Sequence, residues 1–140
     1  MEMVKQISIF VENTGGKLAS ITSILAEGGI NLRAMSLADT TNYGILRIIV
    51  PDPDKAYEIL TQHDIMVKTS EVIGIELDDE VGNLNKALCL LRDNGISVEY
   101  LYALNEKTSL ILKTNNAELA VRVLTTGGIR VLSAKEVYAR

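Results

Sequence analysis

The sequence is poor in the residue types from which most catalytic and metal sites are built. Its 140 residues include one cysteine (Cys89), one histidine (His63), two prolines and no tryptophan. A single cysteine excludes an internal disulfide and any site made of several cysteines. Cys89 falls on an apolar helical stretch and His63 at the end of a predicted helix, so we expect a small core residue and an exposed imidazole. We therefore predict no catalytic residue, no metal site, no cofactor and no enzyme activity.

The chain also lacks a concentration of charge of one sign. Its 14 basic and 18 acidic residues give a net charge of −4, and this mildly acidic balance offers no electrostatic footprint for nucleic acid or an anionic membrane. The apolar run over residues 45–50 is far too short to cross a bilayer, and the N-terminus lacks the pattern of a signal peptide. We expect a cytoplasmic protein with no nucleic-acid and no membrane partner.

What the sequence does contain is an internal repeat. At one offset, 66 residues, Gly16 matches Gly82 and Gly29 matches Gly95; further on, Leu60 and Ile65 match Leu124 and Ile129 at an offset of 64. A two-residue deletion in the second copy explains the change. The repeat predicts two domains, residues 1–70 and 71–140, each close to the lower size limit for independent folding.

Each copy has the hydrophobic pattern of a βαββαβ unit. In the first copy, the pattern predicts a strand around Ile7, Ile9 and Val11, a helix ending at Gly28-Gly29, strands at 31–38 and 45–50, a second helix and a strand from Ile65. In the second copy it predicts strands at 71–77, 97–104, 108–114 and 129–137, and helices at 80–93 and 116–126. The fold class is α+β: two tandem ferredoxin-like units with antiparallel four-stranded sheets, paired into a larger sheet.

Several local signals refine this picture. Asn13 and Thr14 can cap the first helix, Asp52 or Asp54 the second, and the acidic run 78–80 the third. No linker separates the copies, so we expect the last strand of the first copy to feed directly into the first strand of the second. Right-handed crossovers place both helices on one face of each sheet. The candidates for apolar positions on the other face, which a partner would bury, are Phe10, Leu32, Met35 and Val98.

Composition argues against three other uses of this fold. An RNA-recognition module needs aromatic residues on its central strands and a basic face, and this chain has one Phe, five Tyr and an acidic balance. A metal-transfer domain needs a Cys-x-x-Cys loop, which is absent. An acyl-phosphate hydrolase needs an arginine in the first loop, where this chain has Gly15-Gly16-Lys17 and no arginine.

The loop Asn13-Thr14-Gly15-Gly16-Lys17-Leu18, followed at a helix's length by Gly29-Ile30-Asn31, resembles the ACT domain, a regulatory module that binds amino acids in enzymes of amino-acid metabolism. In that family a glycine just before the first helix, and an Asn-Ile or Ile-Asn pair opening the second strand, line the ligand site. The resemblance covers the whole chain as two tandem copies. It implies a protein that binds a small ligand, an L-amino acid, with an enzyme of amino-acid metabolism as a partner.

The resemblance also implies where the ligand lies. Paired domains of this family commonly join edge to edge through strand two, so one domain's loop faces the neighbour's strand, which here would bring Arg33 close as well. Gly16 would let a ligand approach the backbone, the free N–H groups of the first helix would receive an α-carboxylate, and Asn31 offers both a donor and an acceptor. The candidate ligand-binding residues are Asn13, Thr14, Gly15, Gly16, Lys17, Leu18, Ile30, Asn31, Met35, Ser36, Val81, Gly82, Asn83, Leu84, Ser97, Glu99 and Leu101.

The second copy departs from the family pattern. Its loop carries Asp78, Asp79 and Glu80 where a ligand carboxylate would arrive, and Ser97 replaces Asn31. Repulsion between like charges at such short range is costly. We therefore expect the first loop to be the carboxylate site, and the second to be vacant or to hold an ammonium group.

Two hypotheses from different classes follow. The first is a stand-alone tandem ACT protein, a non-catalytic amino-acid sensor that acts on a separate enzyme or regulator. The second is a structural or assembly module of the same fold whose ligand sites have decayed. In both cases the small units and the uncovered sheet faces predict a homo-oligomer.

Overall fold

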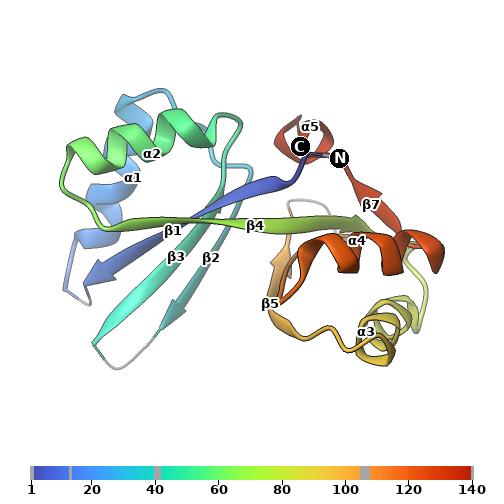
Figure 1. Ribbon diagram of the computed structural model, residues 1–140. Coiled ribbons are helices and arrows are strands. Elements are labelled where there is room, and N and C mark those ends of the chain that lie inside the picture. The colour runs from blue at the N-terminus through green and yellow to red at the C-terminus, as the bar shows by residue number, and fades with distance from the viewer. Residues whose placement is uncertain (1, 13, 40–41, 105–107, 140) are drawn as a thin grey trace. The chain divides into compact units, whose positions relative to one another are not determined.

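The computed structural model describes the chain except residues 1, 13, 40–41, 105–107 and 140. This part of the chain divides into two compact units, one of residues 5–70 and one of residues 2–4 with 71–138. The predicted α+β class, with βαββαβ order in each unit, is confirmed (Figure 1). The order of elements is β1 (Val4–Glu12), α1 (Lys17–Glu27), β2 (Ala34–Asp39), β3 (Tyr43–Ile49), α2 (Pro53–Gln62), β4 (Val67–Glu76), α3 (Asn83–Asp93), β5 (Val98–Ala103), β6 (Ser109–Thr114), α4 (Ala117–Thr126), β7 (Arg130–Leu132) and α5 (Ala134–Ala139).

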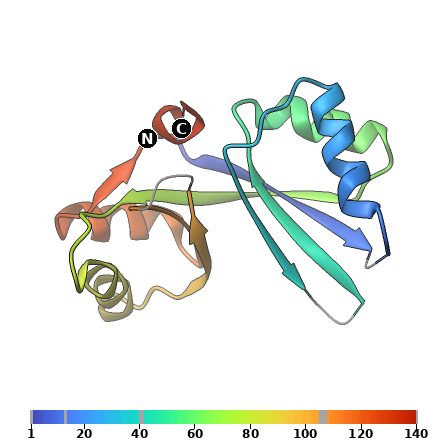
Figure 2. The ribbon, with the colours of Figure 1, turned by 180° about the vertical axis from the view of Figure 1, so that it is seen from behind.

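In the first unit the strand order is β2-β3-β1-β4, and α1 and α2 lie on the same face of the sheet (Figures 1 and 2). β1 and β3 are antiparallel, with Ile7 opposite Ile48 and Ile9 opposite Leu46. Directly opposite residues share a face, and these four side chains form the centre of the core beneath the helices. The other fully packed members of this core are Val11, Ile21, Leu25, Val50, Ala56 and Leu60.

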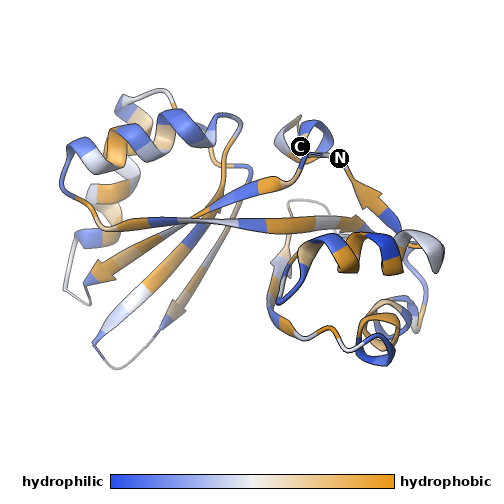
Figure 3. Ribbon diagram, in the orientation of Figure 1, coloured by the Kyte–Doolittle hydropathy of each residue, from blue (hydrophilic) through white to orange (hydrophobic). Residues whose placement is uncertain are grey.

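The second unit repeats this arrangement with the strand order β5-β6-β4-β7. Its core contains Ile73 and Ile75 of β4, Leu112 of β6, and buried residues of α3 and α4. In Figure 3 hydrophobic and hydrophilic stretches alternate along α4, as expected for a helix with one buried face. β4 is a single strand whose first residues belong to the first unit and whose last belong to the second. The expected direct passage from one repeat to the next is confirmed.

The starts of α2 and α4, and the ends of α1, α3 and α4, follow the local sequence signals. Asp52 caps α2 by accepting from the Lys55 amide at 3.1 Å, and Asn116 caps α4 in the same way at 3.2 Å from Leu119. After α1 the chain turns through Gly29 at φ +73°, and the Ile30 amide donates to the Leu25 carbonyl at 2.9 Å. This is a Schellman ending, and the turns at Gly95 and Gly128 repeat it.

The starts of α1 and α3 differ from the prediction. Each begins after a glycine in the left-handed region, Gly16 at φ +85° and Gly82 at φ +92°, and neither has a side-chain cap. Thr14 does not cap α1, and Asn13 lies outside the described residues. The acidic run 78–80 does not open α3, which starts at Asn83. The left-handed glycine redirects the chain immediately before the first helical turn, so the polar residues that precede it stay in the loop.

The predicted strand over 129–137 is wrong beyond Leu132. β7 ends there, and Ser133 starts a short helix, α5. The Glu136 amide donates to Ser133 Oγ at 3.1 Å, and the Ser133 amide donates to Glu136 Oε1 at 3.1 Å. This reciprocal capping box fixes the first turn of the helix. α5 lies on the side of β4 away from α3 and α4 (Figures 1 and 2).

Of the four residues predicted for the face without helices, one lies there. Leu32 and Val98 pack against the two cores beneath the helices. Met35 pairs with Ile48 and therefore lies on the helix side of β2, where it is 49% exposed at the sheet edge. Phe10 is on the predicted face, half-buried, with its ring 5.8 Å from that of Tyr43. The pairing register, which single-strand alternation does not specify, decides these positions.

Candidate functional site

The loop between β1 and α1 exposes its backbone at two consecutive glycines. The Thr14 amide donates to the Glu12 carbonyl at 2.8 Å, which turns the chain, and Gly16 then leads into α1. A side chain at Gly15 or Gly16 would meet no atom within 4 Å. The Lys17 amide donates to the Thr14 carbonyl at 3.4 Å, and no side chain caps the amides of the first turn of α1; such helix-start amides favour an anion. The Ser20 hydroxyl donates to the Gly16 carbonyl at 2.9 Å and does not bind these amides.

A cavity of about 760 Å³ lies beside this loop. The loop and the first turn of α1 form one side of it, and the end of β2 with the start of β3 forms the other. Its lining residues are Val11, Glu12, Thr14, Gly15, Gly16, Leu18, Ala19, Leu37, Ala38, Asp39 and Gly44. This volume falls in the range of pockets that hold small molecules.

The second unit repeats the turn with different side chains. The Glu80 amide donates to the Asp78 carbonyl at 2.8 Å, and Gly82 takes the place of Gly16. Asn83 Nδ2 donates to the same Asp78 carbonyl at 2.8 Å and ties the loop to α3. Val81, which matches Gly15 in the repeat, projects fully into solvent. The backbone that is open in the first loop therefore has a branched side chain beside it in the second.

The structure brings together only part of the predicted site. Thr14, Gly15, Gly16 and Leu18 line the 760 Å³ cavity, whereas Lys17 lines a separate cavity of the same unit. Among the other candidates, Ile30 packs against the core, the Ser97 amide donates to Asn115 Oδ1 at 3.0 Å, and Glu99 pairs with Lys113 at 3.3 Å. The other candidates do not line the 760 Å³ cavity: Asn31, Met35, Ser36, Val81, Gly82, Asn83, Leu84 and Leu101.

Sequence reasoning missed the residues of β2 that complete the cavity, Leu37, Ala38 and Asp39. Leu37 is 56% exposed and lies on the same face as Met35, two positions earlier. The period of two in a strand was the available signal. This period does not show that the loop lies beside the last residues of β2 and away from its first residues.

The groups considered for catalysis stand apart from this cavity. His63 ends α2, is exposed as predicted, and has Nδ1 2.9 Å from the Ile59 carbonyl. Cys89 is half-buried on α3, near Asn85, and is not the core residue that was predicted. Among the described residues, no three His, Cys, Asp or Glu side chains are grouped so that they could hold a metal ion. In the same part of the chain, no helix has the length and apolar character needed to cross a membrane.

The family described as an ACT domain pair matches residues 2–139. The chain belongs to this family. As an ACT domain pair, it has the expected two copies of the glycine loop in two ferredoxin-like units. A comparison with curated proteins finds no match.

Solved structures show the same fold. A protein from Bacteroides thetaiotaomicron is 35% identical, with a TM-score of 0.92 over 99% of this chain and 97% of that one. The regulatory subunit of aspartate kinase from Thermus flavus has a TM-score of 0.64 at 16% identity, covering 90% of this ACT domain pair and 94% of that chain. The ligand-free regulatory subunit from Thermus thermophilus gives 0.64 at 18%, covering 90% and 93%. The chain thus shares its fold with regulatory subunits.

Proposed function

We propose that this ACT domain pair is a non-catalytic sensor that binds an L-amino acid at the 760 Å³ cavity of its first unit and regulates a separate enzyme or regulator of amino-acid metabolism. The observation that supports this most directly is the open backbone at Gly15 and Gly16, beside a cavity and at an uncapped helix start. The α1 amides would receive the α-carboxylate. Asp39, on the opposite wall, would receive the ammonium group.

The two loops are expected to differ in function. In the first, no side chain at Gly15 obstructs a ligand. In the second, Val81 stands at that position, and Asp78, Asp79 and Glu80 are exposed just before it. A carboxylate would meet both a steric obstacle and like charge there. We therefore assign the amino-acid site to the first unit.

The edge of the first unit's sheet supports association with a second chain. β2 is the edge strand, and its Met35 and Leu37 are 49% and 56% exposed. An apolar edge strand tends to pair with another strand. We propose a homo-oligomer in which β2 of one chain lies against β2 of another and closes the cavity that Leu37 lines.

A thermal-shift screen of the full chain with the twenty amino acids tests the sensor. A ligand at a hundredfold excess over its Kd stabilises the native state by about 2.7 kcal/mol, which should raise the melting temperature by roughly 5–10 °C. Gly15→Val should abolish the shift, because Gly15 lies outside the left-handed region and a Cβ there meets no protein atom, so only the ligand is obstructed.

The matched control is Val81→Gly, which makes the opposite change in the second loop and should leave the shift intact. If no amino acid at millimolar concentration moves the transition, the sensor is rejected in favour of the alternative, an assembly module of the same fold. Sedimentation at micromolar concentration should show a species heavier than the 15.3 kDa monomer. A monomer would contradict the proposed pairing through β2.

A further inference from the structure

A second cavity of about 530 Å³ lies in the first unit, where β1 ends, α1 begins and α2 passes into β4. It shares Val11 and Glu12 with the loop cavity, but its other lining residues are different. Apolar side chains of α1 and of the segment before β4 line it, namely Ile21, Ile24 and Ile65. Lys17, Glu12 and Asp64 contribute charges of both signs. The function proposed above does not involve this cavity.

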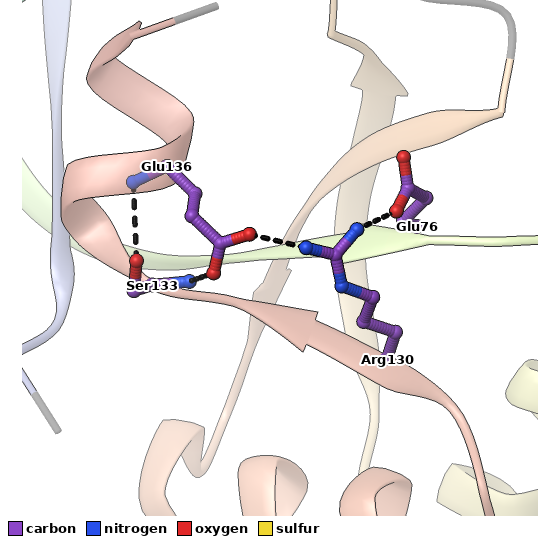
Figure 4. A network of polar contacts seen from close by, with 4 residues as sticks. All are labelled: Glu76, Arg130, Ser133 and Glu136. Carbon is purple, nitrogen blue, oxygen red and sulfur yellow. Dashed lines mark hydrogen bonds and ion pairs between the residues drawn. The ribbon is translucent and has the colours of Figure 1, made fainter.

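The internal repeat provides a comparison for this cavity within the same chain. At the corresponding place in the second unit, the cavity has only about 150 Å³. The residues that match Phe10 and Met66 there are Glu76 and Arg130, and these two form an ion pair (Figure 4). Arg130 also binds Glu136 of α5, which the first unit lacks. In the second copy the cavity is smaller and an ion pair stands at these two positions, whereas in the first copy both positions carry apolar side chains.

Groups at the larger cavity can recognise a zwitterion. The Phe10 amide donates to the Met66 carbonyl at 3.1 Å. Amides two residues apart in a strand point to the same side, so the Glu12 amide points to the side of β1 on which β4 lies, toward the residues that precede β4. This amide and the Lys17 ammonium are donors for a carboxylate. The Asp64 carboxylate is an acceptor for an ammonium group. His63 also lines this cavity, and its Nδ1 donates to the Ile59 carbonyl at 2.9 Å.

The geometry points to a second ligand site in this cavity, for an α-amino acid with a large apolar side chain. The side chain would lie against Ile21, Ile24 and Ile65, and the charged head group between Lys17 and Asp64. A volume of about 530 Å³ accommodates a molecule of this size. This site is separate from the loop cavity, so it does not depend on the function proposed there.

Isothermal titration of the full chain with leucine, isoleucine, methionine or phenylalanine tests the site, with glycine as the probe that lacks the apolar side chain. At least one apolar amino acid should bind and glycine should not. The variant F10E/M66R introduces the charge pair of the second copy and should abolish this binding. Met66→Arg alone, at a position that is 70% exposed, keeps the test valid if the double variant fails to fold. Lys17→Gln should weaken binding roughly tenfold through loss of a charge-assisted hydrogen bond.

The variant Gly15→Val separates the two sites. If it removes the binding of apolar amino acids while M66R does not, the ligand belongs to the loop cavity and the second site is rejected. Binding of none of the four apolar amino acids, or binding that persists in M66R, also overturns the proposal. Loss of binding in M66R with retention in Gly15→Val supports it, whether or not the loop cavity has a ligand of its own.

Discussion

Replacing Gly74 by alanine should destabilise the second unit, because α5 packs directly onto this position of β4. A Cβ at residue 74 would lie 2.6 Å from Cγ2 of Val137 and 3.5 Å from Cβ of Leu132. Non-bonded carbon atoms prefer separations of about 3.5–4.0 Å. Val137 is completely buried and has a β-branched side chain with one favoured rotamer in a helix. It cannot turn away easily, so α5 must shift.

The expected cost follows from two independent estimates. Overpacking of a well-packed core costs typically about 1–3 kcal/mol. Complete detachment of α5 would expose Val137, and the burial of one such side chain contributes roughly 1.5–3 kcal/mol. We therefore expect Gly74→Ala to lower the free energy of unfolding by about 2 kcal/mol, which corresponds to a fall in the melting temperature of roughly 4–8 °C.

A double-mutant cycle with Val137→Ala tests the cause. Val137→Ala alone removes two methyl groups, a loss of about 1.6 kcal/mol at about 0.8 kcal/mol each, before any cavity term. In the double variant the alanine at position 74 occupies part of the space that is vacated. The double variant should therefore be more stable than the sum of the single changes predicts, by about 1–2 kcal/mol.

Urea denaturation followed by circular dichroism measures all these differences. Gly28→Ala is the matched control, since a Cβ there would clash with the Cδ1 atom of Ile59, at 2.6 Å, and would lie at ordinary contact distance, 3.5–3.6 Å, from the Ile24 and Leu25 carbonyl oxygens. The Cδ1 atom ends a longer, rotatable side chain, so the cost should stay below about 1 kcal/mol. If Gly74→Ala is as stable as the wild type, or if the effects of Gly74→Ala and Val137→Ala are additive in the double variant, the packing of α5 on Gly74 is refuted.

Two further substitutions test local backbone features. Asp64 has φ +56°, and the matching residue of the second copy is Gly128. Asp64→Gly should therefore raise the free energy of unfolding, measured by thermal denaturation, by about 0.5–1 kcal/mol. A loss of stability would show that the Asp64 side chain is itself stabilising. Ser133→Ala removes the side-chain cap of α5 and should cost about 1 kcal/mol, whereas Ser133→Asp should keep most of the stability; equal losses would contradict the capping role seen in Figure 4.

Much of the candidate site could be inferred from the sequence, because a glycine loop is a local feature. The resemblance to the ACT domain predicts the segment from Thr14 to Leu18 as ligand-binding, and four of its five members line the loop cavity. Leu37 and Asp39 could not be placed there, since their contact with the loop depends on where β2 ends relative to β1. The cavity bounded by Ile24 and Asp64 was also missed, because segments far apart in the sequence form it.

Helix boundaries likewise depend partly on local sequence and partly on tertiary contacts. The sequence predicts Asp52 as a cap of α2, because a capping side chain acts on an amide three residues later, and Asn116, for which no cap was predicted, caps α4 in the same way. The residues of the capping box, Ser133 and Glu136, are present in the sequence, but the apolar residues after Ile129 fit a strand and predict one there. Burial of Val137 against Gly74 decides in favour of the helix.

By itself, then, the sequence determined the duplication, the βαββαβ order of each unit and the position of the glycine loops, since all three are set by local periodicity and by the backbone freedom of glycine. Only the tertiary structure decided that Met35 faces the helix side of its sheet, that α5 packs on Gly74, and that Arg130 pairs with Glu76 at the smaller of two matching cavities. These features depend on strand register and on contacts between distant segments, which no local pattern encodes.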